Sequence, residues 1–585
     1  MRTALVCVVL TAGLLIAEQA AWAQESPAAG KPTEFKKLIY ISDNFIRPAN
    51  VDSTIEVLKK AAAAGYTGVL LSDCKLDRWE ETVTVQRPLY DDNLKRVRQA
   101  CRDLKLELIA CVLGQNMDLL SNDPNLAEGM PVVDAPFVLR DGRLVPADED
   151  FKVLNGSFEQ ARRENQPDGW SVDAPGKAGF LDTQVKFEGK QSLRFEDLKA
   201  KSEHSLGRAN QRVQVKPFRY YYASVMVKTE NFVGRGTFNF TVLGHANGLA
   251  HQTFDIAPTQ DWKKIEIVFN TLDNKEVGIY VGSWGGETGK IWFDDVRVAP
   301  GGLVNLIRRD SCPFKVTSAD GKTLYAEGKD FSEARDPKLG NVKWPGDYQY
   351  WYEQPVVSVP QGSRLKEGDV VLVSYYHAMN TLGWGVFACM AEPKTLEIAR
   401  RNLANVHKVL EPDGYMLPYD EIRHWGWDPS CEKTGLTAAQ MLADNTRMCV
   451  EMIRQDAPGR PIYAWNDMFD PHHNAGKNGY DYLVKGQDPF WGSWEGLPKE
   501  VLILNWNGDP AKRKQSMKFF ADRGHRQILC GFYDAPSENM ASWIKDAADM
   551  PGISGVMYTT WAKNFSELEK YLKVVDSARN APGAK

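Results

Sequence analysis

The sequence lacks a dominant charge, and it lacks the runs of one sign that a polyanion-binding protein needs. Among its 585 residues, 71 Lys and Arg stand against 76 Asp and Glu, which gives a formal net charge of -5. Such a balance provides no basic field for nucleic acid, so we expect no nucleic-acid partner. With 43% hydrophobic and 25% charged residues, the composition is that of a globular protein and excludes a disordered or collagen-like chain.

Cysteine is also scarce, and the common nucleotide and nucleophile motifs are absent. Eight of the nine cysteines follow residue 23, and no two of them form a Cys-x-x-Cys pair. A disulfide scaffold and a paired-cysteine zinc motif are therefore not expected. The sequence contains no GxSxG, no P-loop and no GxGxxG, so no organic cofactor is implied.

One apolar run stands at the N-terminus and no later run is long enough to span a bilayer. Arg2 precedes an apolar stretch over residues 4–17, and Ala21-Trp22-Ala23 follows it. This pattern predicts a secretory signal peptide over 1–23 that is cleaved near Ala23. We expect an exported protein, periplasmic or extracellular, whose mature chain has no membrane span.

The order of expected elements predicts an α/β fold with an all-β insertion. Strand patterns alternate with helix patterns up to residue 112, and this alternation returns after residue 392 with five more strands. Three strands plus five predict a (β/α)8 TIM barrel, with a jelly-roll sandwich inserted after the third barrel strand. The expected segments are a first barrel part over 32–150, the jelly roll over 151–300, a β-rich insertion over 301–391 and a second barrel part over 392–580.

Several fragments of the expected sandwich resemble bacterial carbohydrate-binding modules of the jelly-roll type. They are Asn155-Gly-Ser-Phe-Glu159, Phe187-Glu-Gly-Lys-Gln-Ser-Leu193 and Ile291-Trp-Phe-Asp-Asp-Val296. The resemblance implies a possible structural calcium ion with Glu159 and Asp295 as ligands, because calcium prefers oxygen donors. The alternative is that both carboxylates only cap strand ends.

Acidic and aromatic residues follow the expected barrel strands, where such barrels carry their chemistry. Eight of the 17 tryptophans lie between Trp425 and Trp561. Carboxyl pairs perform glycoside hydrolysis, and aromatic rings stack on sugars, so the pattern favours an oligosaccharide or polysaccharide substrate. The expected substrate-binding residues are Asp43, Asp73, Trp465, Asp467, Trp494, Glu495, Trp506, Tyr533, Asp534 and Trp561.

The segment Tyr419-Asp420-Glu421 resembles the strand-four motif of family 20 glycoside hydrolases, the β-N-acetylhexosaminidases, and of the related family 123. The resemblance implies that Glu421 is the general acid/base and that Asp420 orients the 2-acetamido group of the substrate, whose carbonyl oxygen is the nucleophile. Trp465, Asp467, Trp506, Tyr533, Asp534 and Trp561 match the pocket residues of those families. To act as an acid near neutral pH, Glu421 needs a raised pKa, which an apolar aromatic pocket would supply.

Three other interpretations remain open from the sequence. In the first, Glu421 works with Asp467 or Glu495 on a sugar without a 2-acetamido group, as a retaining or inverting glycosidase. In the second, Asp467, Asp470, His472 and His473 hold a metal ion in a hydrolase. In the third, the protein binds glycan without turnover.

Overall fold

In the computed structural model of the chain, the description covers residues 35–79, 86–114, 119–148, 151–234, 236–245, 248–341, 347–380, 385–477 and 483–581. The predicted signal peptide over 1–23 lies outside these residues. No helix in the described part is both long and apolar enough to cross a membrane.

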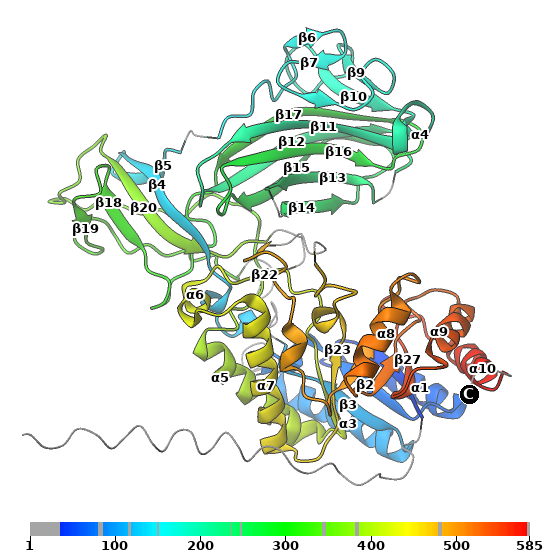
Figure 1. The fold of residues 1–585 in the computed structure, drawn as a ribbon. Coiled ribbons are helices and arrows are strands. Elements are labelled where there is room, and N and C mark those ends of the chain that lie inside the picture. The colour runs from blue at the N-terminus through cyan, green and yellow to red at the C-terminus, as the bar shows by residue number, and fades with distance from the viewer. Residues whose placement is uncertain are drawn as a thin grey trace, which may run out of the picture.

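Eight parallel strands close into a barrel in the lower part of Figure 1, and β27 pairs with β1 to complete it. The strands are β1 (Lys36–Ser42), β2 (Gly68–Ser72), β3 (Glu107–Cys111), β21 (Gly414–Leu417), β23 (Ile462–Trp465), β25 (Leu502–Asn505), β26 (Gln527–Leu529) and β27 (Ile553–Tyr558).

Helices pack around much of this barrel, and local sequence explains their ends. Helix α1 begins at Pro48, whose fixed φ suits a first turn, and stops at Gly65, which has a φ of 97°. Thr437 and Gln440 form a reciprocal capping box at the start of α7. The helices are α1 (Pro48–Ala64), α3 (Arg87–Asp103), α5 (Pro393–Leu410), α6 (Pro429–Thr434), α7 (Ala438–Asp456), α8 (Arg513–Asp522), α9 (Met540–Ala547) and α10 (Leu568–Arg579).

The predicted fold class, an α/β protein with a helix-flanked (β/α)8 barrel, is wrong. Between β23 and β25 the described residues form only the short turns η5 (Asp467–Phe469) and η6 (Ser493–Gly496) and the strand β24 (Leu483–Val484), with no α-helix. The segment is rich in Gly, Pro, Asp and Asn, which favour turns over helix. Most strands also lie outside the barrel, in antiparallel sheets.

Two five-stranded antiparallel sheets form a sandwich between β3 and β21 in chain order. One sheet has the order β15 (Gln260–Asn270), β12 (Tyr220–Glu230), β17 (Lys290–Pro300), β10 (Ser192–Glu196) and β9 (Gly179–Asp182). The other has β14 (Gly248–Phe254), β13 (Phe238–Leu243), β16 (Glu276–Trp284), β11 (Leu206–Gln214) and β8 (Ser171–Val172).

A third antiparallel sheet lies beside the sandwich at the left of Figure 1. Its order is β19 (Leu324–Tyr325), β18 (Lys315–Ser318), β20 (Val370–His377), β4 (Met130–Arg140) and β5 (Arg143–Pro146). The remaining strands pair as β6 (Ala161–Arg163) with β7 (Gln166–Pro167) and as β22 (His424–Trp425) with β24.

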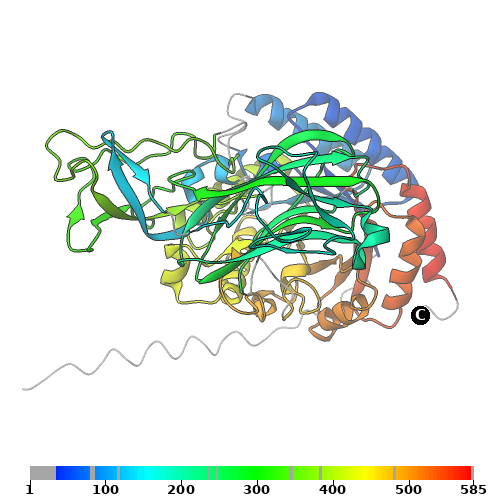
Figure 2. The ribbon, with the colours of Figure 1, turned by 90° about the horizontal axis from the view of Figure 1, so that it is seen from above.

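The sandwich overlies the barrel in the view of Figure 2, and the loop behind β21 contacts it. Trp427, in the loop behind β21, packs edge-on against Phe218 of the sandwich with ring centroids 6.4 Å apart. Both residues belong to one apolar cluster. The loop that carries Asp420 and Glu421 is therefore anchored at its far end by the inserted β-domain.

Candidate active site

Many of the predicted site residues follow barrel strands directly, so they lie at one end of the barrel. This placement follows from parallel pairing, because parallel strands present their carboxyl ends at the same edge. Asp43 follows β1 and Asp73 follows β2. Asp420 and Glu421 follow β21, and Asp467 follows β23. Trp506 follows β25, Tyr533 and Asp534 follow β26, and Trp561 follows β27.

Three carboxyl groups lie close together behind β21 and β23. The backbone N–H of Glu421 donates to Oδ2 of Asp467 across 2.9 Å. Asp467 is fully buried and also accepts from Nδ2 of Asn474 at 2.9 Å and from Nε1 of Trp506 at 3.3 Å. These three N–H donors favour the ionised form of Asp467.

Asp420 is the carboxyl group that holds a proton most readily. Burial, followed by the charges of Asp467 and Glu421, raises the pKa of Asp420 well above its usual value. Burial also raises the pKa of Asp467, but its N–H donors act against the shift. No other residue in the described part of the chain donates a hydrogen bond to the Asp420 carboxyl, so its ionised form lacks the donors that stabilise ionised Asp467.

Glu421 lies in a more polar setting than the sequence predicts. Its φ is 46°, so the chain turns sharply just beyond the end of β21. The side chain is 39% exposed, and its Oε1 accepts from Nη2 of Arg423 at 2.6 Å. The rise in pKa that was predicted for Glu421 is found at Asp420 instead, where burial and the charges of Asp467 and Glu421 cause it.

Five aromatic rings form a continuous wall at this end of the barrel. Tyr40 lies 6.2 Å from Trp465 and 5.2 Å from Trp561, measured between ring centroids. Tyr533 continues the wall, with centroid distances of 6.4 Å to Trp561 and 5.9 Å to Trp506. Trp465 is 3% exposed and Trp561 is 55% exposed, so the wall extends from the barrel interior to the surface.

Asp420 lies beside this wall. Its charge contributes to raising the pKa of both Tyr40 and Tyr533, although burial is the main cause for each tyrosine. The sequence reasoning missed Tyr40, which points into the barrel on the same side of β1 as Leu38. It also missed Arg423, although that residue follows the Asp-Glu pair by only two positions.

Asp43, Asp73 and Asp534 are each engaged in ion pairs or hydrogen bonds with nearby protein groups. Asp73 is 4% exposed and is held by Nζ of Lys75 at 2.9 Å and by the backbone N–H of Phe45 at 2.9 Å. Asp43 pairs with Nζ of Lys563 at 2.8 Å. Asp534 accepts from the Thr560 hydroxyl and from the backbone of Trp561 and Ala562, and these donors hold its pKa below the usual value.

Trp494 and Glu495 do not join the three carboxyl groups. Both lie in η6, which packs against α7 on the outside of the barrel. Trp494 contacts Phe519 with centroids 5.2 Å apart, and Glu495 is exposed. This placement removes Glu495 as the second carboxylate of a two-carboxylate mechanism and leaves Asp467 for that role.

The histidine-rich loop behind β23 does not form a metal cluster among the described residues. Asp470 is fully buried and accepts from Nδ2 of Asn466 at 2.8 Å and from the Ser516 hydroxyl at 2.5 Å. His473 packs against Trp506 with ring centroids 4.3 Å apart. These side chains hold the loop in place, so the geometry does not favour the metal-hydrolase interpretation.

The proposed calcium ligands of the sandwich have separate partners. Glu159 accepts from the backbone N–H of Lys190 at 2.8 Å and of Gln191 at 3.3 Å. Asp295 is paired with Arg297. Burial raises the pKa of Asp295. The two carboxylates do not appear together in a group of metal-ligating atoms within the described ranges.

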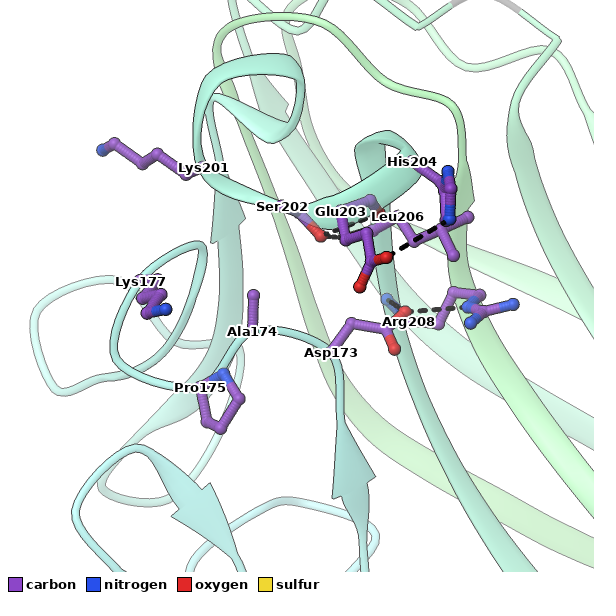
Figure 3. Close-up of a pocket in the computed structure, with 10 residues that line it drawn as sticks. All are labelled: Asp173, Ala174, Pro175, Lys177, Lys201, Ser202, Glu203, His204, Leu206 and Arg208. Atoms are coloured by element: carbon purple, nitrogen blue, oxygen red, sulfur yellow. Dashed lines mark hydrogen bonds and ion pairs between the residues drawn. The ribbon is translucent and has the colours of Figure 1, made fainter.

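A pocket of about 450 Å³ opens at one end of the sandwich. Figure 3 shows its charged lining, which includes Asp173, Glu203, His204 and Arg208. Nε of Arg208 pairs with Oδ2 of Asp173 at 2.7 Å. The pocket lining contains no aromatic side chain apart from the imidazole of His204, and it belongs to a different domain from the barrel carboxylates.

No family model and no curated protein matches this chain. Among solved structures it is similar to a CBM4 protein, with 20% identity and a TM-score of 0.20 over 26% of this chain and 99% of that chain. It is also similar to TmCBM61 in complex with β-1,4-galactotriose, at 17% identity, a TM-score of 0.20 and the same coverages. A third similar structure is the CBM22-1 xylan-binding domain from Paenibacillus barcinonensis Xyn10C, at 17% identity and a TM-score of 0.18, covering 25% of this chain and 91% of that chain. Likenesses at these TM-scores carry no argument about this chain.

Proposed function

We propose that this protein is an exported glycoside hydrolase whose active site lies at the carboxyl end of the barrel. The observation that carries the proposal is the setting of Asp420. Its carboxyl group lies beside an aromatic wall and next to two further carboxyl groups, and no other described residue donates a hydrogen bond to it. A saccharide can stack a sugar-ring face on the aromatic wall, and it can donate a hydrogen bond to the Asp420 carboxyl.

The arrangement suits hydrolysis assisted by a 2-acetamido group on the substrate. Asp420 accepts no hydrogen bond from another described residue, and an amide N–H from the substrate provides a donor. Glu421 lies nearer the surface, where the leaving group departs. The acetamido carbonyl oxygen attacks the anomeric carbon, the glycosidic bond breaks, and Glu421 transfers its proton to the bridging oxygen. This transfer requires that Glu421 take up a proton from solvent and open its ion pair with Arg423 when substrate binds.

A panel of nitrophenyl glycosides with and without a 2-acetamido group tests this proposal. We expect turnover of a 2-acetamido substrate, and its loss by about 10²- to 10⁴-fold in Asp420→Asn and in Glu421→Gln. Glu495→Gln is the matched control, because this carboxylate is exposed on the outside of the barrel. Equal turnover in all three variants refutes the assignment of the site.

A second mechanism is favoured by the raised pKa of Asp420. In it, Asp420 is the proton donor and Asp467 is the second carboxylate, with no role for an acetamido group. The two mechanisms differ in the sign of their pH dependence. If Asp420 must be ionised to hold the acetamido N–H, activity rises as pH increases through its pKa. If Asp420 is the acid, activity falls over the same interval.

The sandwich offers a separate surface for glycan binding, which we propose as a second function of the chain. Tyr280 and Trp284 are partly exposed on β16 and point to the same side, with ring centroids 6.4 Å apart. The Tyr280 ring lies over Gly278, where a Cβ atom would be 2.9 Å from it. We expect a Trp284→Ala variant to lose oligosaccharide binding in calorimetry without loss of turnover on nitrophenyl substrates. Unchanged oligosaccharide binding would exclude this surface.

A further inference from the structure

Two thiols and a carboxylate are buried together outside the candidate active site. Cys389 and Cys431 have their sulfur atoms 3.7 Å apart, and Sγ of Cys431 lies 3.5 Å from Oε2 of Glu128. All three residues are at most 2% exposed. They are the group of His, Cys, Asp and Glu side chains within the described ranges whose ligand atoms all lie within 4.8 Å of one another. We propose that Glu128, Cys389 and Cys431 bind one Zn²⁺ ion.

The spacing of the donor atoms fits tetrahedral zinc. With Zn–S bonds of about 2.3 Å and a Zn–O bond of about 2.0 Å, two thiolates lie about 3.8 Å apart and a thiolate and an oxygen about 3.5 Å apart. The observed distances are 3.7 Å and 3.5 Å. Thiolate donors select Zn²⁺ over Mg²⁺ or Ca²⁺, which prefer oxygen ligands.

The ligands are fixed by the backbone around them, as a metal site requires. The segments of Glu128 and Cys389 run antiparallel, with Glu128 N–H bonded to the Phe387 carbonyl and Cys389 N–H bonded to the Leu126 carbonyl, both at 2.8 Å. Cys431 lies in the short helix α6. The site therefore joins the segment that enters the third sheet with the loop behind β21.

The remaining oxygen of Glu128 is oriented by that same loop. Oε1 of Glu128 accepts the backbone N–H groups of Trp427 at 2.9 Å and Asp428 at 3.0 Å. These bonds leave Oε2 directed toward the thiols. Outer contacts of this kind hold a ligand in the orientation that a metal ion needs.

The charges around the site also suit a divalent cation. Arg309, the nearby buried cation, pairs with Asp428 and with Oε2 of Glu392 at 3.3 Å. Starting from ionised Glu128 and two neutral thiols, binding of Zn²⁺ breaks two S–H bonds, forms two Zn–S bonds and one Zn–O bond, and releases two protons to solvent. The net charge of the buried group is then unchanged, and no electron is transferred.

Elemental analysis of the purified full-length protein tests the proposal. After incubation with Zn²⁺ and removal of excess metal, we expect one zinc per chain, and Co²⁺ in its place is expected to give a thiolate charge-transfer absorption band. Cys389→Ala and Cys431→Ala are expected to lose both signals. Cys101→Ala, which removes a buried thiol on α3, is the matched control and retains them.

Wild-type protein alone decides the question if a variant does not fold. Zinc that survives gel filtration and is released by a thiol-modifying reagent supports the site. A non-reducing peptide map that links residue 389 to residue 431, or the absence of zinc and of a Co²⁺ band in reduced protein, overturns it.

Discussion

The backbone N–H of Glu421 donates a hydrogen bond to the buried carboxylate of Asp467, 2.9 Å away. The bond connects the loops behind two neighbouring barrel strands, β21 and β23. It holds the chain in the left-handed turn at Glu421. Asp467 thus fixes the position of the Asp-Glu pair and contributes to the electrostatics of Asp420 at the same time.

Substitution of Asp467 by Asn tests this double role. An amide at this position has lost one acceptor oxygen, so one of its three N–H donors is left without a partner in a buried setting. We expect the free energy of unfolding to fall by about 1–3 kcal/mol. The loss of negative charge also lowers the pKa of Asp420, so the pH profile of turnover shifts toward acid. Denaturant unfolding and pH-dependent kinetics measure the two effects, and an unshifted profile contradicts the coupling.

Trp561 and Trp465 both contact Tyr40 in the aromatic wall but differ in exposure, so we predict different results for their substitution. Trp561 is 55% exposed, so Trp561→Ala is expected to change the free energy of unfolding by no more than about 0.5 kcal/mol and to raise KM. Trp465 is 3% exposed in the barrel interior, and Trp465→Ala is expected to cost about 3–5 kcal/mol. Thermal unfolding and steady-state kinetics compare the two. An unchanged KM in Trp561→Ala would remove that residue from the substrate site.

The stability of the protein depends on pH through Asp420. Because its folded-state pKa is raised, Asp420 stabilises the folded state in its neutral form, and that contribution is lost as pH rises through the folded-state pKa. Asn cannot ionise. We therefore expect the stability of Asp420→Asn relative to wild type to increase with pH above the usual aspartate range. Chemical unfolding at a series of pH values measures this trend, and a constant difference contradicts it.

Two buried histidines are expected to make the stability depend on pH in the opposite direction to Asp420. Burial lowers the pKa of His377 and of His424 from 6.5 to about 3. For such groups the stability is fully present above 6.5 and is lost as pH falls toward 3, by about 1.4 kcal/mol per pH unit for each imidazole. His377→Gln is expected to remove about half of this slope. If the stability difference between wild type and His377→Gln is the same at pH 5 as at pH 7.5, the imidazole of His377 is not neutral and buried as described.

The sequence could place candidate residues behind barrel strands because strand patterns and their polar terminators are local. The residues behind β21, β23, β25, β26 and β27 do come together, since parallel pairing forces them to one end. The same reasoning failed between β23 and β25. Trp494 and Glu495 follow β23 in the chain, but a segment of turns carries them to the outside of the barrel.

The electrostatic roles within the site were beyond sequence reasoning because they depend on packing. The sequence does not show which of Asp420 and Glu421 is buried, and Asp467, which acts on Asp420, comes from another barrel strand. Arg423 reaches Glu421, whereas burial and Asp467 act on Asp420. The buried group of Glu128, Cys389 and Cys431 was missed for the same reason, since 261 residues separate Glu128 from Cys389 along the chain.

The most direct test of the central claim is the hydrolysis of nitrophenyl 2-acetamido-2-deoxy-glycosides by wild type, Asp420→Asn, Glu421→Gln and Glu495→Gln. The account predicts release of nitrophenol by wild type and Glu495→Gln, with losses of about 10²- to 10⁴-fold in the other two. Release at equal rates by all four proteins, or by none on any sugar of the panel, would contradict it.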